Sequence, residues 1–224
     1  FTILKNQDVW FTENMEEQQK LGSFFKQIDD TIALHQRKLD LLKEQKKGYL
    51  QKMFPKNGAK VPELRFAGFA DDWEERKLGD ISYKVKEKNK TGEFTETLTN
   101  SAEYGIINQR DFFDKDISNA KNLTGYYVVK NDDFVYNPRI SNFAPVGPIK
   151  RNKLGRTGVM SPLYYVFRTH DIDKNYFEKY FDTVYWHRFM ELNGDSGARA
   201  DRFAIKDSVF VEMPIPYPTM DEQQ

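Results

Sequence analysis

Histidine and cysteine, two side chains often used in catalysis and metal binding, are scarce or absent in this chain. Its 224 residues include three histidines and no cysteine. His35, His170 and His187 lack the spacing of a metal site, and the lack of thiols excludes disulfides, thiolate–zinc sites and cysteine nucleophiles. We find no phosphate-binding glycine loop and no serine-nucleophile motif. The sequence therefore predicts a protein that is not an enzyme and that uses neither a metal nor a cofactor.

One tetrapeptide comes near a catalytic motif. Tyr136-Asn137-Pro138-Arg139 resembles the Asn-Pro-Pro-aromatic motif of adenine methyltransferases, in which the aromatic ring stacks on a flipped base. Arg139 and Ile140 stand where that motif has its second proline and its aromatic residue. We therefore do not expect methyl transfer by this chain alone, and transfer from S-adenosylmethionine by the purified chain would show otherwise.

A long acid-free stretch is the strongest functional signal in the composition. Residues 134–170 contain no Asp or Glu, although about five or six would be expected at the average frequency of the chain. The stretch carries six cations, whereas the whole chain has 34 basic and 34 acidic residues and no net charge. Nucleic-acid-binding faces exclude carboxylates, which repel phosphate, and use Lys and Arg to displace counterions. We therefore predict DNA contact by this stretch, with ordinary solvated loops as the alternative.

The candidate DNA-contacting residues fall into three loop regions. Amides and hydroxyls can read base edges, and basic groups can bind phosphates or guanine. The acid-free stretch contributes Asn137, Arg139, Ser141, Asn142, Lys150, Arg151, Lys153 and Arg156. A second loop contributes Arg199 and Arg202, and a third contributes Gln109 and Arg110. For the second and third loops, a solvated surface is as good an interpretation as DNA contact.

Residues 15–54 predict one long helix with an apolar seam. The seam follows alternating spacings of four and three, which is typical of a coiled coil. Its positions are Leu21, Phe25, Ile28, Ile32, His35, Leu39, Leu42, Lys46, Tyr49 and Met53. We interpret His35 as a polar seam residue and not as a metal ligand. Asn14 is the predicted cap and the run 55–58 the predicted end. Such a helix requires a partner along its seam.

The rest of the chain predicts a linker over residues 55–72 and an α+β domain over 73–218. Short β-prone runs separated by turn signals indicate strands at 104–108, 126–129, 134–136, 163–167 and 209–213, and a helix is expected at 176–192. The predicted fold is therefore α+β: one globular recognition domain with a mixed, irregular sheet, attached to a long helix that forms a coiled coil.

A short internal repeat links the two ends of the chain. Residues 15–19 read MEEQQ and residues 220–224 read MDEQQ, 205 positions later. Since the first copy begins the long helix, we expect the second copy to begin another. Residues 219–224 are then the start of a second helix, and residues 1–14 the end of a preceding domain or a stub strand.

Together these segments resemble a known family. The helix EEQQKLGSFFKQIDDTIALHQRKLDLLKEQKKGYLQKMFP is followed by WEERKLGDI, FVYNPRI, SGARADRFAI and PIPYPTMDEQQ. This pattern is similar to the specificity (S) subunit of type I restriction–modification enzymes. The resemblance implies two target recognition domains, each followed by a helix, with the two helices packed antiparallel as a spacer. Each domain reads one half of a split DNA target, and methylation and cleavage belong to separate subunits.

The resemblance also sets the expected partners. They are double-stranded DNA, the modification and restriction subunits, and a second recognition half or a second copy of the chain. We expect either a fragment of a full subunit or a half-subunit that dimerises. The chain has no signal-peptide pattern and no apolar run of membrane-spanning length, so we expect a cytoplasmic protein without a membrane partner. The alternative is a coiled-coil protein-interaction module with incidental basic loops.

Overall fold

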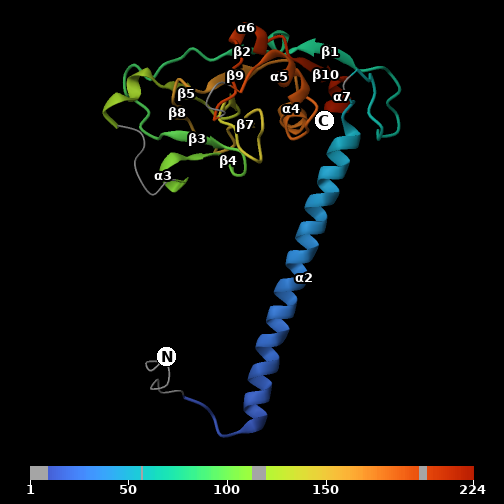
Figure 1. The fold of residues 1–224 in the computed structure, drawn as a ribbon, viewed down its shortest axis with the longest axis vertical. Coiled ribbons are helices and arrows are strands. Elements are labelled where there is room, and N and C mark those ends of the chain that lie inside the picture. Colours follow the sequence, from blue (N-terminus) through green and yellow to red (C-terminus); the bar gives the residue numbers. More distant parts are fainter. Residues whose placement is uncertain (1–9, 57, 113–119, 197–200) are drawn as a thin grey trace. The chain divides into compact units, whose positions relative to one another are not determined.

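The computed structural model of the chain describes residues 10–56, 58–112, 120–196 and 201–224. The chain divides between Gly48 and Tyr49 into two compact units. The first contains most of the long helix α2 (Met15–Met53), and the second contains the strands and the shorter helices of the described residues (Figure 1).

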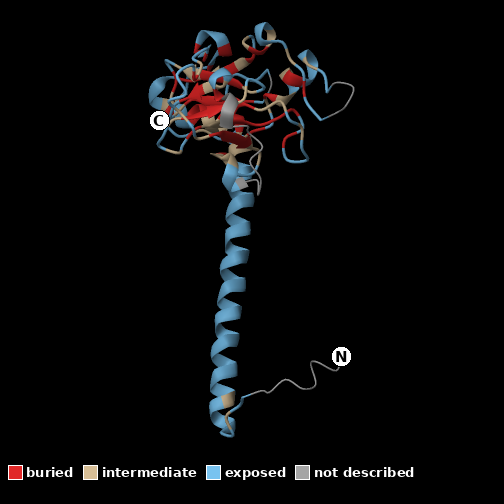
Figure 2. Cartoon of the chain, turned by 90° about the vertical axis from the view of Figure 1, so that its left-hand side faces the viewer, coloured by how far each residue is buried: buried red, intermediate tan, exposed pale blue. Residues whose placement is uncertain are grey.

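The long helix is confirmed and begins at its predicted cap. The Asn14 side-chain oxygen accepts hydrogen bonds from the backbone amides of Glu16 (3.0 Å) and Glu17 (3.3 Å). No residue of α2 is buried, and Figure 2 shows its surface as exposed along almost the whole length. The large apolar residues of the predicted seam are 39% to 61% exposed, namely Leu21, Phe25, Ile28, Ile32, Leu39, Leu42 and Tyr49. The apolar seam is therefore uncovered in the single chain.

The last turn of α2 belongs to the globular unit. Phe54, the first residue after the helix, is 5% exposed. Its ring centroid lies 5.2 Å from that of Tyr176, 5.8 Å from Tyr180 and 6.4 Å from Trp73. Phe54 packs in this aromatic cluster at the end of the helix, and Pro55, which follows it, disfavours helical geometry at residue 54. Of the predicted terminating run, Asn57 lies outside the described residues.

A four-stranded antiparallel sheet forms the centre of the globular unit, in the order β2-β9-β6-β7. Its strands are β2 (Ser82–Lys84), β9 (Tyr165–Thr169), β6 (Phe134–Tyr136) and β7 (Ile149–Arg151). Side chains alternate between its faces. Phe134 pairs with Phe167, and both face an aromatic core, whereas the neighbouring pair Val135 and Val166 faces a smaller aliphatic core. The sheet is thus buried on both faces and gives a rigid base to the loops at its ends.

Three two-stranded sheets surround the central one, and all are antiparallel. They pair β1 (Glu74–Lys77) with β10 (Pro214–Tyr217), β3 (Leu98–Ser101) with β4 (Gly105–Asn108), and β5 (Tyr127–Val129) with β8 (Gly158–Met160). The short helices are η1 (Leu78–Asp80), α3 (Gln109–Phe112), η2 (Ala120–Gly125), α4 (Lys174–Phe181), α5 (His187–Asn193), α6 (Asp207–Phe210) and α7 (Met220–Gln223). The predicted α+β fold with a long helix is confirmed. Four predicted strands correspond to β4, β5, β6 and β9 within two residues.

The strand predicted at 209–213 is wrong. These residues form the end of α6 and a turn, and their apolar side chains are buried three positions apart, the spacing of a helical turn. The strand β10 follows directly and contains two prolines, which lack a backbone N–H. It tolerates them because it pairs on one side with β1. The carbonyls of Pro214 and Pro216 accept hydrogen bonds from the hydroxyls of Tyr180 and Tyr176.

The single helix predicted at 176–192 is also wrong, because it is broken into α4 and α5. Side chains within the break compete for the carbonyls that a continuing helix would use. The Thr183 hydroxyl donates to the Tyr180 carbonyl, and the Trp186 indole N–H donates to the carbonyl of Thr183 at 3.0 Å. The break places Trp186 in the aromatic core, where it is 2% exposed.

Candidate nucleic-acid interface

The cations on and after β7 pair with acids of α4 and of its C-cap. Lys150 bonds to Asp182 at 3.0 Å, and both Arg151 (2.9 Å) and Lys153 (3.1 Å) pair with Glu178. Burial raises the pKa of Asp182, but the opposing attraction of two lysines outweighs it and lowers the pKa overall. These three cations of the acid-free stretch therefore obtain their carboxylates from residues 178 and 182, and the stretch does not form a uniformly basic surface.

Two further arginines of the stretch are held in bidentate pairs. Arg156 binds both carboxylate oxygens of Glu96 at 2.7 Å, and Asn108 donates to the same carboxylate at 2.9 Å. The hydrogen bonds from Arg156 lower the pKa of Glu96. Arg168 binds the buried Asp133 at 2.6 and 2.9 Å, which raises the pKa of its guanidinium. Both arginines join neighbouring segments of the fold.

Arg139 differs from the other cations of the stretch. Within the described residues it makes no ion pair and is exposed. It lies opposite Arg202 in an isolated antiparallel bridge, closed by hydrogen bonds from Ile140 to Asp201 (3.0 Å) and from Phe203 to Pro138 (2.7 Å). Opposed residues of such a pair project on the same face. We call residues 137–144 and 201–203 the arginine loops.

Arg202 is likewise exposed and without an ion pair among the described residues. The tertiary structure thus joins two of the three predicted loop regions at one place. The remaining member of the second region, Arg199, lies outside the described residues.

The polar side chains of the first arginine loop have different surroundings. Asn137 is occupied at both ends: its amide nitrogen donates to the Asn100 carbonyl at 2.9 Å, and its side-chain oxygen accepts from the Arg139 amide at 3.0 Å. It therefore positions Arg139 through the backbone. Ser141 and Asn142 are exposed, and their side chains are available to a partner.

Gln109 and Arg110 lie elsewhere, at the start of α3. The backbone amide of Gln109 donates to the Thr97 carbonyl at 2.8 Å, and the backbone amide of Arg110 donates to the side-chain oxygen of Asn108 at 2.8 Å. Asn108 in turn binds the carboxylate of Glu96. These contacts attach the third predicted region to the β3–β4 hairpin and to the Glu96–Arg156 pair.

A cavity of about 840 Å³ opens beside the arginine loops. Pro138 and Phe203 of the loops line it together with Tyr165 of β9, and Lys206 and Asn193 add polar groups. Burial, with a smaller contribution from Asp207, raises the pKa of Tyr165 to about 12, so its hydroxyl stays protonated. Sequence reasoning missed this cavity because its walls come from five separate segments, which lie around residues 84, 136–138, 162–165, 192–195 and 203–210.

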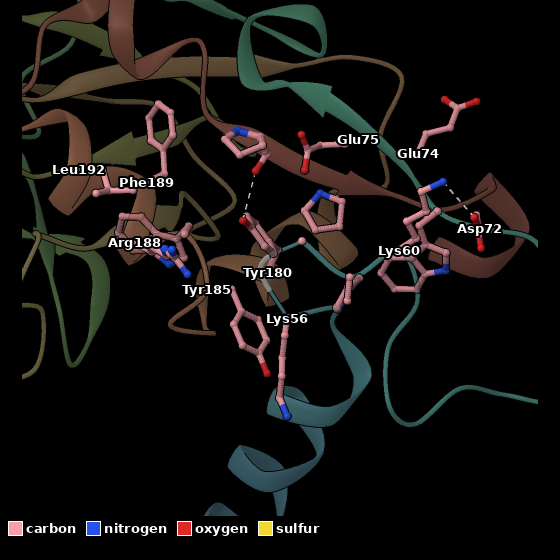
Figure 3. Close-up of a pocket in the computed structure, with 17 residues that line it drawn as sticks. Lys56, Lys60, Asp72, Glu74, Glu75, Tyr180, Tyr185, Arg188, Phe189 and Leu192 are labelled. Atoms are coloured by element: carbon pink, nitrogen blue, oxygen red, sulfur yellow. Dashed lines mark hydrogen bonds and ion pairs between the residues drawn. The ribbon is translucent and has the colours of Figure 1, made fainter.

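A second cavity, of about 850 Å³, lies where α2 ends (Figure 3). Tyr180, Tyr185 and Phe189 contribute aromatic walls, and Lys60 forms an ion pair with Asp72 at its rim. None of the predicted DNA-contacting residues is among the described residues that line it. The two cavities share Leu192 of α5 in their linings.

The second copy of the repeated motif is locked to the domain by contacts that sequence reasoning missed. Arg65 binds Glu222 through two hydrogen bonds of 2.7 and 2.8 Å. Gln223 is 6% exposed; its side-chain oxygen accepts from the Asp173 amide at 2.8 Å and its nitrogen donates to the Pro218 carbonyl at 2.9 Å. The repeated motif was the signal in the sequence that could have pointed to these contacts.

No group of three or more His, Asp or Glu residues suited to a metal ion occurs among the described residues. The helices of the same residues include none that is both long enough and apolar enough to cross a membrane.

Neither a protein-family model nor a curated protein matches this sequence. Its structure is similar to that of the HsdS subunit from Thermoanaerobacter tengcongensis, with a TM-score of 0.53 and 15% identity, over 91% of this chain and 46% of that one. A chain from a structural study of assembly and conformational transition of the type I R-M system gives a TM-score of 0.52 and 16% identity, over 93% and 48%. The chain thus spans about half the length of these proteins. At these identities the likeness is one of fold, and the chain has the fold of about half of an HsdS specificity subunit.

Proposed function

We propose that the chain is a non-catalytic DNA-recognition module of a type I restriction–modification complex, in which residues 73–218 read one half of a bipartite target. The observation that carries this proposal is the pair Arg139 and Arg202. Two like charges held side by side without a carboxylate partner among the described residues are best stabilised by a polyanion. The fold shared with HsdS supports the same partner, and DNA is consistent with the cytoplasmic location expected from the sequence.

The arginine loops suit base and phosphate contacts together. Guanidinium groups bind phosphate or guanine in bidentate geometry, and the exposed Ser141 and Asn142 lie beside them to meet base edges. The ion-paired cations of β7 would have to release a carboxylate before they could bind DNA, so we assign them a smaller contribution. Gln109, Arg110 and Arg199 remain proposed as further contacts.

We also propose that the apolar seam of α2 pairs with a second long helix. An uncovered apolar stripe of this length is stable in water only when another helix covers it. The partner is either a helix that continues from α7 or the α2 helix of a second copy. The outer faces of the helix pair would then hold the modification and restriction subunits.

The repeated motif supports such a pairing. Glu17 and Gln18 occupy the positions in the first motif that Glu222 and Gln223 occupy in the second. Glu222 is held by Arg65 of the globular unit, whereas the exposed Glu17 accepts a hydrogen bond from the Thr12 hydroxyl at 2.7 Å. We propose that a preceding recognition domain binds Glu17 and Gln18 through contacts like those of Glu222 and Gln223. Each domain would then fix the start of the helix that follows it.

The DNA assignment is tested by removing the two unpaired arginines. Arg139→Ala/Arg202→Ala should weaken binding to a duplex selected from a random library by about tenfold or more and lower the salt slope by about two. The matched control is Lys153→Ala/Arg156→Ala, which removes the same charge from exposed but ion-paired positions. Fluorescence anisotropy at several salt concentrations measures both quantities.

Equal losses in the two double variants would contradict the assignment to the arginine loops. If the unaltered chain binds no duplex but still self-associates, the rival function holds: a coiled-coil interaction module with incidental basic loops.

A second test lengthens the helix. From Leu21 to Met53 α2 spans roughly 50 Å, about one and a half turns of DNA. Repeating residues 36–39 adds four residues, about 6 Å, and rotates the seam little, so the spacer of the modified target should lengthen by about two base pairs. Methylome sequencing of cells that carry the altered complex reports this spacer directly. An unchanged spacer would mean that the helix does not set the distance.

A further inference from the structure

Phe143 has the most exposed ring among the described aromatic residues of the globular unit, at 79%. It lies with Asn142 in a two-residue turn at the tip of a tight hairpin. The Ser141 amide donates to the Ala144 carbonyl at 3.1 Å, and the Ala144 amide donates back to the Ser141 carbonyl at 3.0 Å. The turn is therefore closed by its own backbone and projects the ring outward.

The base of this hairpin is fixed. Ala144 and Val146 are buried, and the Tyr136 hydroxyl donates to the Val146 carbonyl at 2.9 Å. Gly147 has a φ of 83°, and a Cβ there would lie 2.1 Å from the carbonyl oxygen of Asn137, so only glycine fits. A hairpin so anchored cannot fold Phe143 back onto the core. The free energy of burying its ring is available only from a partner.

The groups around the ring indicate the chemistry of that partner. Arg139 and Arg202 lie at the foot of the hairpin, exposed and without ion pairs among the described residues. Asn142 stands beside the ring. Asp201, on the second arginine loop, is the exposed acid next to them, and a carboxylate can accept from the amino group of cytosine. A partner must therefore offer flat apolar surfaces, polar edges and negative charge together.

Stacked bases between phosphates have this combination. An anionic lipid surface also combines negative charge with apolar depth, but amphipathic binding to lipid requires a broad apolar face. Here the hairpin is two residues wide at its tip, and its other tip residue is the polar Asn142. A narrow tip with one ring fits a base step better than a bilayer.

We propose that Phe143 contacts the bases of a DNA duplex directly, its ring wedged at a base-pair step while Arg139 and Arg202 bind the flanking phosphates. This proposal rests on the proposed function and adds a residue that senses how easily one step of the target opens. Pyrimidine–purine steps unstack most readily, so the wedge would favour such a step without hydrogen bonds to it.

The test compares Phe143→Ala with Phe143→Trp on the full chain. The probe is a duplex selected from a random library by the unaltered chain, with 2-aminopurine placed in turn at each position. The Phe143→Ala chain should bind about tenfold more weakly, because stacking on one base is lost. It should also lose a fluorescence change at one step that the unaltered and Phe143→Trp chains both produce. Phe66→Ala, which removes a 67% exposed ring elsewhere, is the control and should behave as the unaltered chain.

Each other outcome is decisive. Unchanged affinity and fluorescence with Phe143→Ala would overturn the wedge while leaving DNA recognition standing. Weaker binding without the fluorescence change in any chain would show a contact that does not open the step, which also overturns it. If the unaltered chain selects no duplex, the proposed function itself fails. Co-sedimentation with phosphatidylserine vesicles that is lost in Phe143→Ala would assign the ring to a lipid surface.

Discussion

Asp133→Ala is expected to lower the free energy of unfolding by about 3 kcal/mol or more. The Asp133 side chain is 1% exposed and accepts from Arg168 at 2.6 and 2.9 Å and from the Lys130 amide at 2.7 Å. Its removal leaves a half-buried guanidinium and a backbone amide without their acceptor. The loss should appear in urea denaturation followed by circular dichroism.

Two variants calibrate this result. Asp133→Asn keeps one acceptor and should lose less stability. Lys60→Ala breaks an ion pair whose side chains are 73% and 64% exposed, and should change stability by less than about 0.5 kcal/mol. If Asp133→Ala matched Lys60→Ala, the buried pair would not stabilise the turn before β6. That turn matters for function because β6 leads directly into the first arginine loop.

Phe54→Ala should destabilise the globular unit by about 3–5 kcal/mol. Phe54 fills the space between Trp73, Tyr176 and Tyr180, and its removal leaves a cavity among rigid rings that cannot collapse onto it. Since Phe54 directly follows α2, the same change should release the last helical turn, where the Tyr185 hydroxyl donates to the Gln51 carbonyl.

The measurement is again chemical denaturation, combined with hydrogen exchange of the amides of residues 49–53. Phe66→Ala is the control, because that ring is 67% exposed and its loss should be nearly neutral. A stable Phe54→Ala chain with protected amides at 49–53 would show that the aromatic cluster does not hold the end of the helix.

The acid-free stretch shows that the charges along a sequence do not by themselves predict which cations stay unpaired in the fold. Its composition correctly singled out a region rich in cations, but five of its six cations pair with carboxylates among the described residues. The acids are Glu96, Asp133, Glu178 and Asp182, and all four lie outside residues 134–170. Residues far apart in the sequence can form ion pairs when the fold brings them into contact. Within the stretch, Arg139 is the cation without an ion pair among the described residues; the fold sets it opposite Arg202, and their DNA contact stays a prediction.

The local features were determined by the sequence alone. The cap at Asn14, the seam of α2 and strands such as β6 follow from hydrogen bonds and side-chain periodicity within a few residues, so short-range patterns suffice to predict them. The repeat likewise indicated a helix start at Met220. Tertiary structure decided what no local pattern contains: the break between α4 and α5, the Arg65–Glu222 contact, and the pairing of residues 139 and 202. Each depends on segments that are far apart in the sequence and meet only in the folded chain. The neighbours that the fold provides decide whether a charge is paired and whether a ring is buried.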